Sequence, residues 1–329
     1  MQAKQIVVRE KIEQIMNNDH QAVMLQESIT ALNLKADGIY LDATYGRGGH
    51  SRAILAQLSQ SAKLLVMDKD PQAIQDAQQL AALDSRVTVF AGSFADLTLF
   101  CRQQQVLHKV DGILFDLGVS SPQLDQADRG FSFMRAGPLD MRMDPNSGVS
   151  VAQWLAVASE NNIAEVLKTL GEEKFSKRIA HAIVTTRQQQ PIITTTQLAK
   201  IIADAIPVKE KHKHPATRSF QALRIMINHE LEDLAQALEQ IFTVLAPFGR
   251  LAVISFHSLE DRIVKQFIAQ QARGDKFPAR MPVTQAQLKP KLRAIGKAIK
   301  PSAQEIASNV RARSAVLRVA EKLPEAANG

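Results

Sequence analysis

The feature that most constrains the fold is a series of short apolar runs, separated by longer stretches with helical spacing. The runs cover 38–42, 64–68, 87–90, 112–116, 251–255 and 314–320. A run without polar alternation indicates a strand buried on both faces, and such strands form parallel sheets covered by helices. Between the second and third runs, a helical pattern over 71–83 begins with Pro71, a residue favoured in the first turn. The sequence therefore predicts an α/β fold with a mostly parallel sheet.

An unusually long gap interrupts this series. The fourth and fifth runs are separated by 134 residues, whereas a crossover between parallel strands needs about a dozen. The gap contains amphipathic helical patterns, one of them capped by Ser150 and another ending at Gly171. Apolar residues spaced by three and four from Leu223 to Leu245 predict one long helix that returns to the sheet. We expect an N-terminal extension at 1–19, one α/β domain at 20–124 and 221–329, and a helical insertion at 125–220.

Composition narrows the class of protein. The 329 residues are 45% hydrophobic and 22% charged, which is ordinary for a globular chain and excludes a coiled coil or a mostly disordered protein. The single cysteine, Cys101, excludes an internal disulfide and a cysteine-cluster zinc site. No apolar run approaches the ~20 residues that span a bilayer, and the N-terminal segment lacks the apolar core of a signal peptide. We expect a cytoplasmic protein without a membrane partner.

The net charge of +7 is concentrated toward the C-terminus. Residues 273–318 carry 11 Lys and Arg against 2 Asp and Glu. Such a local excess of positive charge favours a polyanionic partner, with nucleic acid as the first candidate. The alternative is a solvated basic segment that only keeps the protein soluble.

Two predicted strand ends suggest a nucleoside site, because ligands of open α/β sheets bind beyond the carboxyl ends of the strands. After the first strand, Asp42 is followed by a turn with Gly46, Gly48 and Gly49, which lets the backbone approach a ligand. The helix that follows offers N–H groups to an anion. The second strand ends in Asp68, about 20 residues past the glycines, where a carboxylate can accept hydrogen bonds from ribose hydroxyls.

Two cofactors remain open for this site. In a dinucleotide fingerprint the glycines follow the strand at once and a third glycine packs the helix against the strand. Here Gly46 lies four residues beyond Asp42, and Ser51 stands at the third position. An acid at the strand end suits the ammonium group of S-adenosylmethionine (AdoMet) better than a pyrophosphate. AdoMet is therefore favoured over NAD, and a turn without a ligand is the third possibility.

Two further strand ends and one basic stretch carry candidate groups. Asp116 ends the fourth strand, where it would face cofactor and substrate, or would merely cap a helix. His257 follows the fifth strand, as a catalytic group or as a structural hydrogen-bonding residue. A basic stretch suits phosphate contacts, or else is a solvated loop. Its residues are Lys211, Lys213, Arg218 and Arg224. His212 and His214 have no partner ligands in the pattern, so we expect no metal.

Several segments match the motifs of one protein family. They are 42–51, 68–71, 116–125, 129–134, 137–144, 213–218, 220–224, 255–262 and 311–313. In them the chain resembles the ribosomal RNA small-subunit methyltransferases H, also called MraW, from about His20 to Glu321. The resemblance implies a class I AdoMet-dependent methyltransferase domain, Rossmann-like and mostly parallel, with a helical insertion. It also implies N4-methylation of a cytidine in the decoding centre (P site) of 16S rRNA.

The resemblance implies site residues and partners as well. The family's AdoMet contacts fall on Gly48, Gly49, His50, Asp68, Phe94, Asp116 and Gln123, which adds to Asp42 from the argument above. We expect RNA contacts from the basic stretch and from Arg311 and Arg313. The partner would be 16S rRNA within the 30S subunit, with a homodimer as a further possibility. The chain departs from the family in its longer N-terminus and in Tyr45, where Phe is common.

The implied chemistry is an in-line displacement without a covalent enzyme intermediate, so positioning of the cytosine N4 matters most. Asp116 is the candidate proton acceptor. The aromatic residue that stacks on the base in many amino-methyltransferases is absent after the fourth strand. Phe131, Phe133 and His257 are candidates for that stacking. A nicotinamide dehydrogenase, a DNA cytosine-N4 methyltransferase and a non-catalytic RNA-binding ribosome assembly factor remain as alternatives.

Overall fold

The computed structural model describes residues 22–208, 214–275 and 288–324. The described chain forms two compact units, one containing the residues up to Gly118 and from Asp233 onward, and the other Val119–Glu232. The insertion expected at 125–220 lies inside the second unit, which begins six residues earlier and ends twelve residues later. The N-terminal extension at 1–19 lies outside the described residues.

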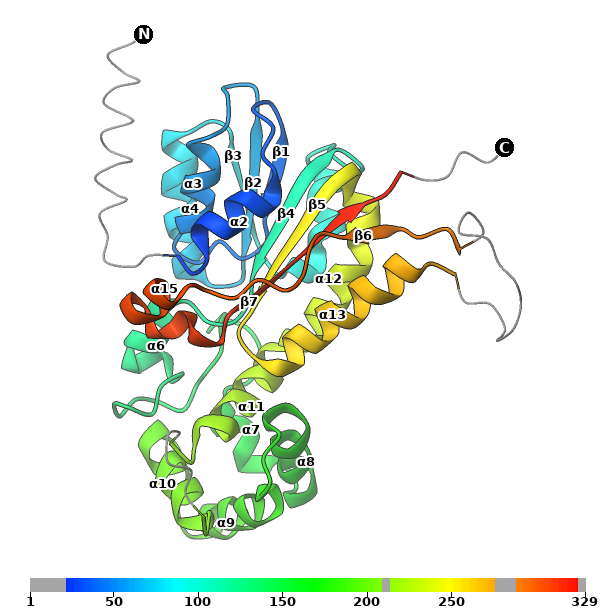
Figure 1. Cartoon of the computed structure of the whole chain (residues 1–329). Helices are drawn as coiled ribbons and strands as arrows, with labels where there is room; N and C mark the ends of the chain where they lie inside the picture. Colours follow the sequence, from blue (N-terminus) through cyan, green and yellow to red (C-terminus); the bar gives the residue numbers. More distant parts are fainter. Residues whose placement is uncertain (1–21, 209–213, 276–287, 325–329) are drawn as a thin grey trace, which may run out of the picture. The chain divides into compact units, whose positions relative to one another are not determined.

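The first unit is built on a sheet whose described strands have the order β3-β2-β1-β4-β5-β7-β6 (Figure 1). The parallel strands are β1 (Ile39–Asp42), β2 (Lys63–Asp68), β3 (Val87–Ala91), β4 (Val110–Asp116) and β5 (Leu245–Ser255). The antiparallel strands are β7 (Val316–Lys322), which pairs with β5, and β6 (Leu292–Ala294) at the edge. This mostly parallel, Rossmann-like sheet of the class I type confirms the expected fold.

The register of the parallel strands brings three carboxylates to one edge of the sheet. Asp42, the last residue of β1, pairs with Val66 of β2 and with Leu114 of β4. Asp68 and Asp116 therefore each lie two residues beyond the level of Asp42, at the carboxyl ends of their strands. This is the edge at which open α/β sheets bind ligands.

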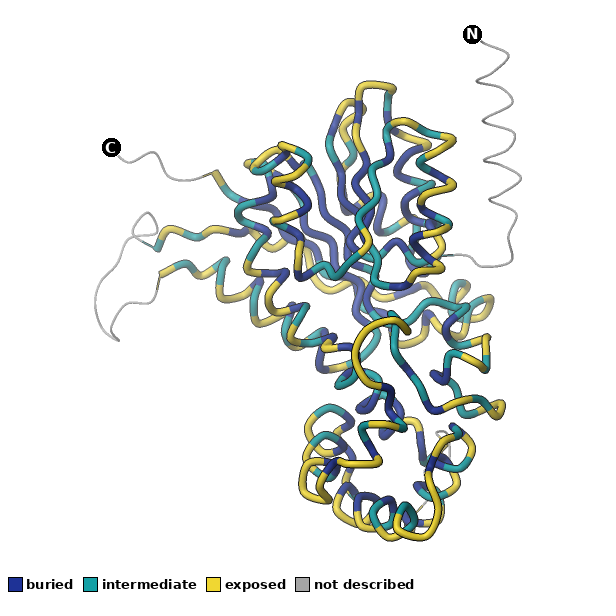
Figure 2. The backbone as a smooth tube through the Cα atoms, turned by 180° about the vertical axis from the view of Figure 1, so that it is seen from behind, coloured by how far each residue is buried: buried dark blue, intermediate teal, exposed yellow. Residues whose placement is uncertain are grey.

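Helices cover both faces of this sheet, as continuously apolar strands require. On one face lie α2 (Leu25–Leu32), α3 (Gly49–Leu55) and α4 (Pro71–Leu83), and on the other α5 (Leu97–Gln103), α12 (Glu230–Val244) and α13 (Ser258–Arg273). Successive residues of one strand enter different cores, since Leu64 packs with the first set and Leu65 with the second. Each such side chain contributes about 1.5–3 kcal/mol on burial. Figure 2 shows the buried strands between helices with exposed outer faces.

The helices begin and end where local chemistry dictates. In α4, Pro71 occupies the first turn and the Asp70 side chain accepts a hydrogen bond from the Gln72 N–H at 2.9 Å, which confirms the expected helix. Shorter elements complete the first unit. They are the 3₁₀ turn η1 (Phe94–Asp96), α15 (Ala303–Ser308) and the 3₁₀ turn η3 (Val310–Ser314).

The second unit is helical around its own apolar core. Its elements are α6 (Ser121–Asp125), η2 (Ala127–Arg129), α7 (Val151–Val157), α8 (Glu160–Gly171), α9 (Ser176–Gln189), α10 (Thr195–Ala205) and α11 (Thr217–Asn228). Ser150 caps α7, because its hydroxyl accepts from the Gln153 N–H at 3.2 Å and the Gln153 side chain accepts from the Ser150 N–H at 2.8 Å. The helix start expected at Ser150 is confirmed.

The long helix expected from Leu223 to Leu245 is wrong as a single element. His229 has a left-handed backbone (φ 55°), which ends α11, and α12 begins at the next residue. Leu245 already belongs to β5. The apolar spacing continues through the break because both helices bury one face, so periodicity alone does not detect the turn.

Candidate functional site

The turn after β1 is bonded directly to the end of β2. The Gly46 N–H donates to Asp68 Oδ2 at 2.8 Å, and the Asp70 N–H donates to Asp68 Oδ1 at the same distance. The Tyr45 N–H donates to the Met67 carbonyl at 2.9 Å. Burial raises the pKa of Asp68 to about 6, against the lowering effect of these two backbone donors. The structure thus places Asp68 beside the glycine turn, as expected for a ribose-binding acid.

Gly48 has a conformation that few other residues adopt. Its φ is 68°, and it immediately precedes α3. A Cβ atom built there would collide with Arg52 Nη1 and would lie 2.5 Å from the Tyr45 hydroxyl. Side chains from α3 and from the turn itself therefore fill the space beside the backbone, and glycine is required for both reasons.

Asp76 of α4 holds those two side chains in place. The Tyr45 hydroxyl donates to Asp76 Oδ2 at 2.6 Å, and Arg52 Nη2 lies 2.9 Å from the same oxygen. Sequence reasoning missed this support, because an acid on an amphipathic helix has the pattern of a solvated residue. The only hint was Tyr45, which departs from the family motif.

Asp42 is enclosed by the turn. Its side chain accepts hydrogen bonds from Ser51 Oγ at 2.6 Å and from the Thr44 N–H at 3.2 Å, and the residue is 1% exposed. Burial raises its pKa to about 6. The carboxylate thus joins the end of β1 to α3 and braces the turn. It would attract a cationic ligand through its negative charge.

Asp116 and His50 face each other at the centre of the edge, with 3.5 Å between Asp116 Oδ2 and His50 Nδ1. His50 Nε2 lies 3.1 Å from the Val23 carbonyl and donates to it, which leaves Nδ1 without a proton in the neutral ring. Burial lowers the pKa of His50 to about 4. Burial, helped by the charges of Asp42 and Glu260, raises the pKa of Asp116 well above its ordinary value. Both shifts favour the neutral forms of the two facing groups.

Asp116 also has an unsatisfied atom. Its Oδ1 is buried and has no hydrogen-bond partner among the described residues. The main chain at this point is fixed, because the Asp116 N–H donates to Thr44 Oγ1 at 2.6 Å. A buried carboxylate oxygen without a donor is costly unless a ligand supplies one. Asp116 thus has the properties of a ligand-facing group.

Phe94 follows β3, in the turn η1. Its ring meets the ring of Phe115 edge to face, with centroids 5.6 Å apart. The preceding loop is bonded to the same strand end as the glycine turn, because the Gly92 N–H donates to the Asp68 carbonyl at 2.8 Å. Phe94, Asp68 and the glycine turn therefore occupy one edge of the sheet, as the family motifs imply.

Gln123 lies in the second unit. It is buried, and its side-chain oxygen accepts from the Ser120 N–H at 2.8 Å as part of the cap of α6. This interaction gives Gln123 a structural task of its own, in addition to the cofactor contact that the resemblance implies.

His257 caps α13. Its Nδ1 accepts from the Glu260 N–H at 3.4 Å, and its Nε2 lies 3.0 Å from Glu260 Oε1. Glu260 in turn accepts from the Phe256 N–H at 2.8 Å. The cap thus occupies Nδ1, whereas the buried Nε2 faces Glu260 without a hydrogen-bond partner among the described residues. The cap supports a structural role for His257 and leaves a catalytic role open.

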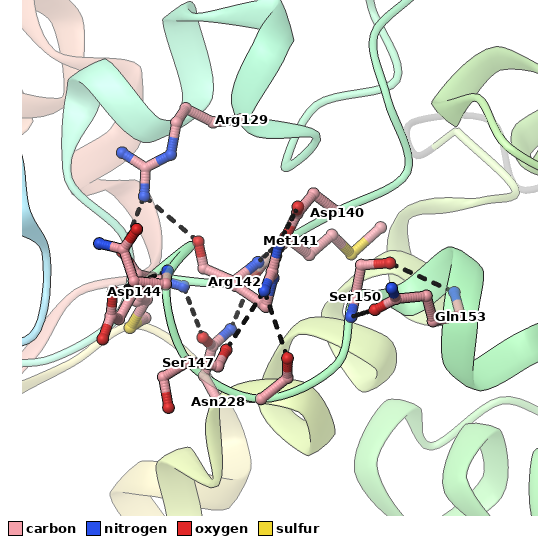
Figure 3. A network of polar contacts seen from close by, with 12 residues as sticks. Arg129, Asp140, Met141, Arg142, Asp144, Ser147, Ser150, Gln153 and Asn228 are labelled. Atoms are coloured by element: carbon pink, nitrogen blue, oxygen red, sulfur yellow. Dashed lines mark hydrogen bonds and ion pairs between the residues drawn. The ribbon is translucent and has the colours of Figure 1, made fainter.

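A polar network orders the long loop of the second unit that carries two of the family segments (Figure 3). Arg129 Nη2 donates to the carbonyls of Arg142 and Met143 at 3.2 and 2.8 Å. The Asn228 amide donates to the Met141 carbonyl and accepts from the Met143 N–H, at 2.8 and 2.7 Å. Arg142 forms a two-pronged ion pair with Asp140. The loop therefore has a defined shape, although it contains no long helix or strand.

The aromatic candidates of this unit differ in their surroundings. Phe133 stacks on His214 with ring centroids 4.6 Å apart, and it meets Phe220 edge to face with centroids 4.8 Å apart. Phe131 is buried, with the Arg129 guanidinium 5.8 Å from its ring centre. Of these two rings, Phe133 is the more exposed and so the better candidate for contact with a base.

The basic candidates separate into three kinds. Lys211 and Lys213 lie outside the described residues. Arg311 and Arg313 are exposed, and Arg218 is partly exposed. Arg224 forms a two-pronged ion pair with Glu230, with both contacts at 2.8 Å and both side chains largely buried. This ion pair gives the Arg224 guanidinium a structural role, which makes it a weaker candidate for a phosphate contact.

The described ranges hold neither a metal cluster nor a membrane span. No group of three or more His, Cys, Asp or Glu side chains in them is arranged to hold a metal ion. None of their helices is both long enough and apolar enough to cross a membrane.

Several solved structures can be aligned with most of this chain at low identity. A chain from Clostridium thermocellum is 12% identical with a TM-score of 0.43, over 93% of this chain and 99% of that one. An rRNA methylase from Streptococcus thermophilus is 14% identical with a TM-score of 0.40, over 91% and 94%. A SAM-dependent O-methyltransferase from Thermotoga maritima is 11% identical with a TM-score of 0.41, over 96% and 72%.

A family model also matches most of the chain. The model of the MraW methylase family matches residues 17–323 of the 329-residue chain. The matched range includes the glycine turn, all three acids at the sheet edge and the ordered loop of the second unit. The resemblance seen in the sequence motifs is confirmed, and this chain belongs to the MraW methylase family.

Proposed function

We propose that this methylase binds AdoMet at the carboxyl edge of its sheet and transfers the methyl group to N4 of a cytidine in the decoding centre (P site) of 16S rRNA. The observation that carries the proposal is Asp116. Its buried oxygen lacks a partner among the described residues, and its strand ends beside the glycine turn and Asp68. An unpaired carboxylate oxygen beside a ribose-binding acid suits a nucleoside ligand that also carries a positive charge.

The donor set fits AdoMet better than NAD. Asp42, Asp68 and Asp116 end three strands, and burial raises the pKa of each. A cationic ligand relieves the mutual repulsion of these acids, whereas a pyrophosphate would add to it. Asp68 would hold the ribose and Phe94 would pack on the adenine, and the bound AdoMet would supply an activated methyl group.

The protein's own part in the reaction is positioning and proton transfer. Asp116 is the proposed acceptor of a proton from the cytosine amino group, and its raised pKa makes its ionised form a stronger base. The unprotonated His50 Nδ1 faces Asp116 Oδ2 at 3.5 Å, so it offers that carboxylate no hydrogen bond and does not lower its basicity. Phe133 is the proposed stacking partner of a base taken out of the RNA fold.

RNA binding is proposed for the exposed Arg311 and Arg313 and the partly exposed Arg218, with Lys211 and Lys213 in the same role. Arg224 contributes to stability through Glu230 instead. Removal of one cation that binds a phosphate should reduce the slope of log K against log salt by about 0.7–0.9. The variant R311A/R313A should therefore lose about 1.4–1.8 units of that slope and keep AdoMet binding.

One experiment tests the proposal as a whole. The protein would be incubated with labelled AdoMet and 30S subunits from cells that lack its gene, and the RNA would be digested and analysed by mass spectrometry. N4-methylcytidine at a single decoding-centre position is the expected result. Free 16S rRNA and duplex DNA in parallel reactions distinguish the assembled particle, naked RNA and DNA as substrates. Methylation of DNA alone, or of none of the three, would contradict the proposal.

A second experiment tests the proton acceptor. Single-turnover transfer would be measured with saturating AdoMet and bound substrate for the wild type and Asp116→Asn. An unchanged rate on bound substrate would remove Asp116 from this role.

The same proposal places the enzyme in the cytoplasm, where its rRNA substrate is assembled. Sedimentation with and without 30S subunits tests whether the enzyme acts as a dimer.

A further inference from the structure

Asp233 of α12 contacts residues from two different loops of the sheet edge. Its Oδ2 lies 2.5 Å from Lys69 Nζ and accepts a hydrogen bond from Ser93 Oγ at 2.5 Å. The carboxylate is largely buried, with 16% of its side chain exposed. One oxygen atom therefore joins the loop after β2 to the loop after β3.

The two partners of Asp233 are the immediate neighbours of the groups proposed to hold the nucleoside. Lys69 follows Asp68, the ribose candidate, and Ser93 precedes Phe94, the adenine candidate. The Gly92 N–H also donates to the Asp68 carbonyl, so the two loops touch through their backbones as well. The distance between Asp68 and Phe94 thus depends on how these loops are held.

The same face of α12 makes a second set of contacts with this region. Gln236 and Gln240 donate to the Ala95 carbonyl at 3.1 and 2.6 Å, and Gln240 accepts from the Thr98 N–H at 2.8 Å. Asp233, Gln236 and Gln240 follow helical spacing and lie along one side of the helix. They anchor the helix on η1 and the start of α5, so the Asp233 carboxylate has little freedom to move.

We propose that Asp233 is a positioning residue for the nucleoside half of AdoMet, because it fixes the ribose-side loop and the adenine-side loop to one atom. The proposal rests on the proposed AdoMet site. Asp233 does not itself belong to that site, and its effect should appear in cofactor affinity and not in the methyl-transfer step. Neither the family motifs nor the sequence pattern singles out this residue.

The test compares Asp233→Asn with Asp111→Asn in the full chain. Asp111 is a matched control, because its carboxylate also joins a lysine to a second group, Lys35 Nζ at 2.6 Å and the Ile39 N–H at 3.0 Å. It lies near the amino ends of β1 and β4, at the opposite edge of the sheet. Titration calorimetry with S-adenosylhomocysteine (SAH) gives the affinity, methyl transfer gives KM and kcat, and thermal unfolding gives Tm.

We expect D233N to raise the SAH Kd and the AdoMet KM by about tenfold, the factor for removal of a charged hydrogen bond. The kcat at saturating AdoMet should stay within about twofold of wild type. D111N should lower Tm by about as much as D233N does, but it should leave Kd and KM unchanged. Ser93→Ala removes the bond to Asp233 and also the cap on the Ala95 N–H at 3.0 Å. The loss of affinity in S93A/D233N should be smaller than the sum of the two single losses, because both changes remove the shared Ser93–Asp233 bond.

Equal affinity of D233N and wild type would overturn the inference, as would an equal loss in D233N and D111N. Additive losses of affinity in S93A and D233N would also overturn the inference. Because affinity is measured well below Tm, this comparison can be made even if D233N unfolds at a lower temperature than the wild type. Failure of the wild type to bind SAH is a different result, since it would refute the AdoMet site itself.

Discussion

Replacement of Gly48 by alanine tests the glycine turn most directly. The backbone there has φ 68°, and a Cβ would collide with Arg52 Nη1 and lie 2.6 Å from Tyr45 Cζ. The left-handed conformation costs a non-glycine residue about 1–2 kcal/mol. Forcing the buried Tyr45 ring and the Arg52 guanidinium away adds about 1–3 kcal/mol, the usual range for overpacking. The total is about 2–5 kcal/mol of lost stability, and a displaced turn at the cofactor site.

Gly296→Ala separates these two terms. Gly296 has the same φ of 68° in the same unit, and a Cβ there meets no atom within 4 Å. G296A therefore carries the backbone cost alone, whereas G48A carries the backbone cost and the clash. At about 2–4 °C per kcal/mol for a domain of this size, G48A should unfold several degrees below G296A.

The assay is thermal unfolding of both variants, followed by AdoMet KM at a temperature where both are folded. G48A should show a KM raised by at least about tenfold, since the turn must shift to admit the methyl group. G296A should keep the wild-type KM. Equal Tm values and equal KM values for the two variants would refute the claim that packing beside Gly48 shapes the site.

Three further outcomes are expected. Burial raises the folded-state pKa of Asp116 above its unfolded value, so stability without AdoMet should fall as pH rises from about 4 through that raised pKa. Asp116→Asn should lack this loss and be more stable than wild type at pH 8 in thermal unfolding, and a variant no more stable than wild type there would contradict this account. Asp76→Ala removes the carboxylate that pairs with Arg52 and should raise the AdoMet KM about tenfold with little change in kcat. An unchanged KM would show that the glycine turn does not need support from Asp76. Burial raises the pKa of Cys101 to about 12, so a thiol reagent at pH 8 should label the protein only after denaturation, and rapid labelling of the folded protein would disprove this burial.

The sheet could be predicted from the sequence because each parallel strand contains a short, mostly apolar run, and three of the strands end in an aspartate. Asp42, Asp68 and Asp116 marked three of those ends, and the register in the structure brings them to one edge. β6 could not be predicted in this way. It is a three-residue edge strand with two exposed positions, so it carries no apolar pattern.

The polar supports of the site were also beyond the sequence. Asp76 and Asp233 are acids on amphipathic helices, and nothing in their spacing distinguishes them from solvated residues. Their roles arise from partners far away in the chain, at Arg52 and at Ser93. The break at His229 was missed for a similar reason, since its left-handed backbone has no local signal such as glycine.

The long insertion has a consequence for synthesis of the protein. β4 pairs with β5 in the finished sheet, but β5 begins only at Leu245, well over a hundred residues after β4 ends at Asp116. At about 5–20 residues per second, a ribosome needs roughly 6–26 s to make the intervening chain. During that interval β4 is an apolar strand with one unpaired edge, which is a site of aggregation in other proteins. The insertion folds around its own core from helices that are local in sequence, so it can form before β5 emerges. We therefore expect nascent chains stalled just before Leu245 to contain a folded helical unit and to depend on chaperones. Chains released after β7 should keep the helical unit and no longer depend on chaperones.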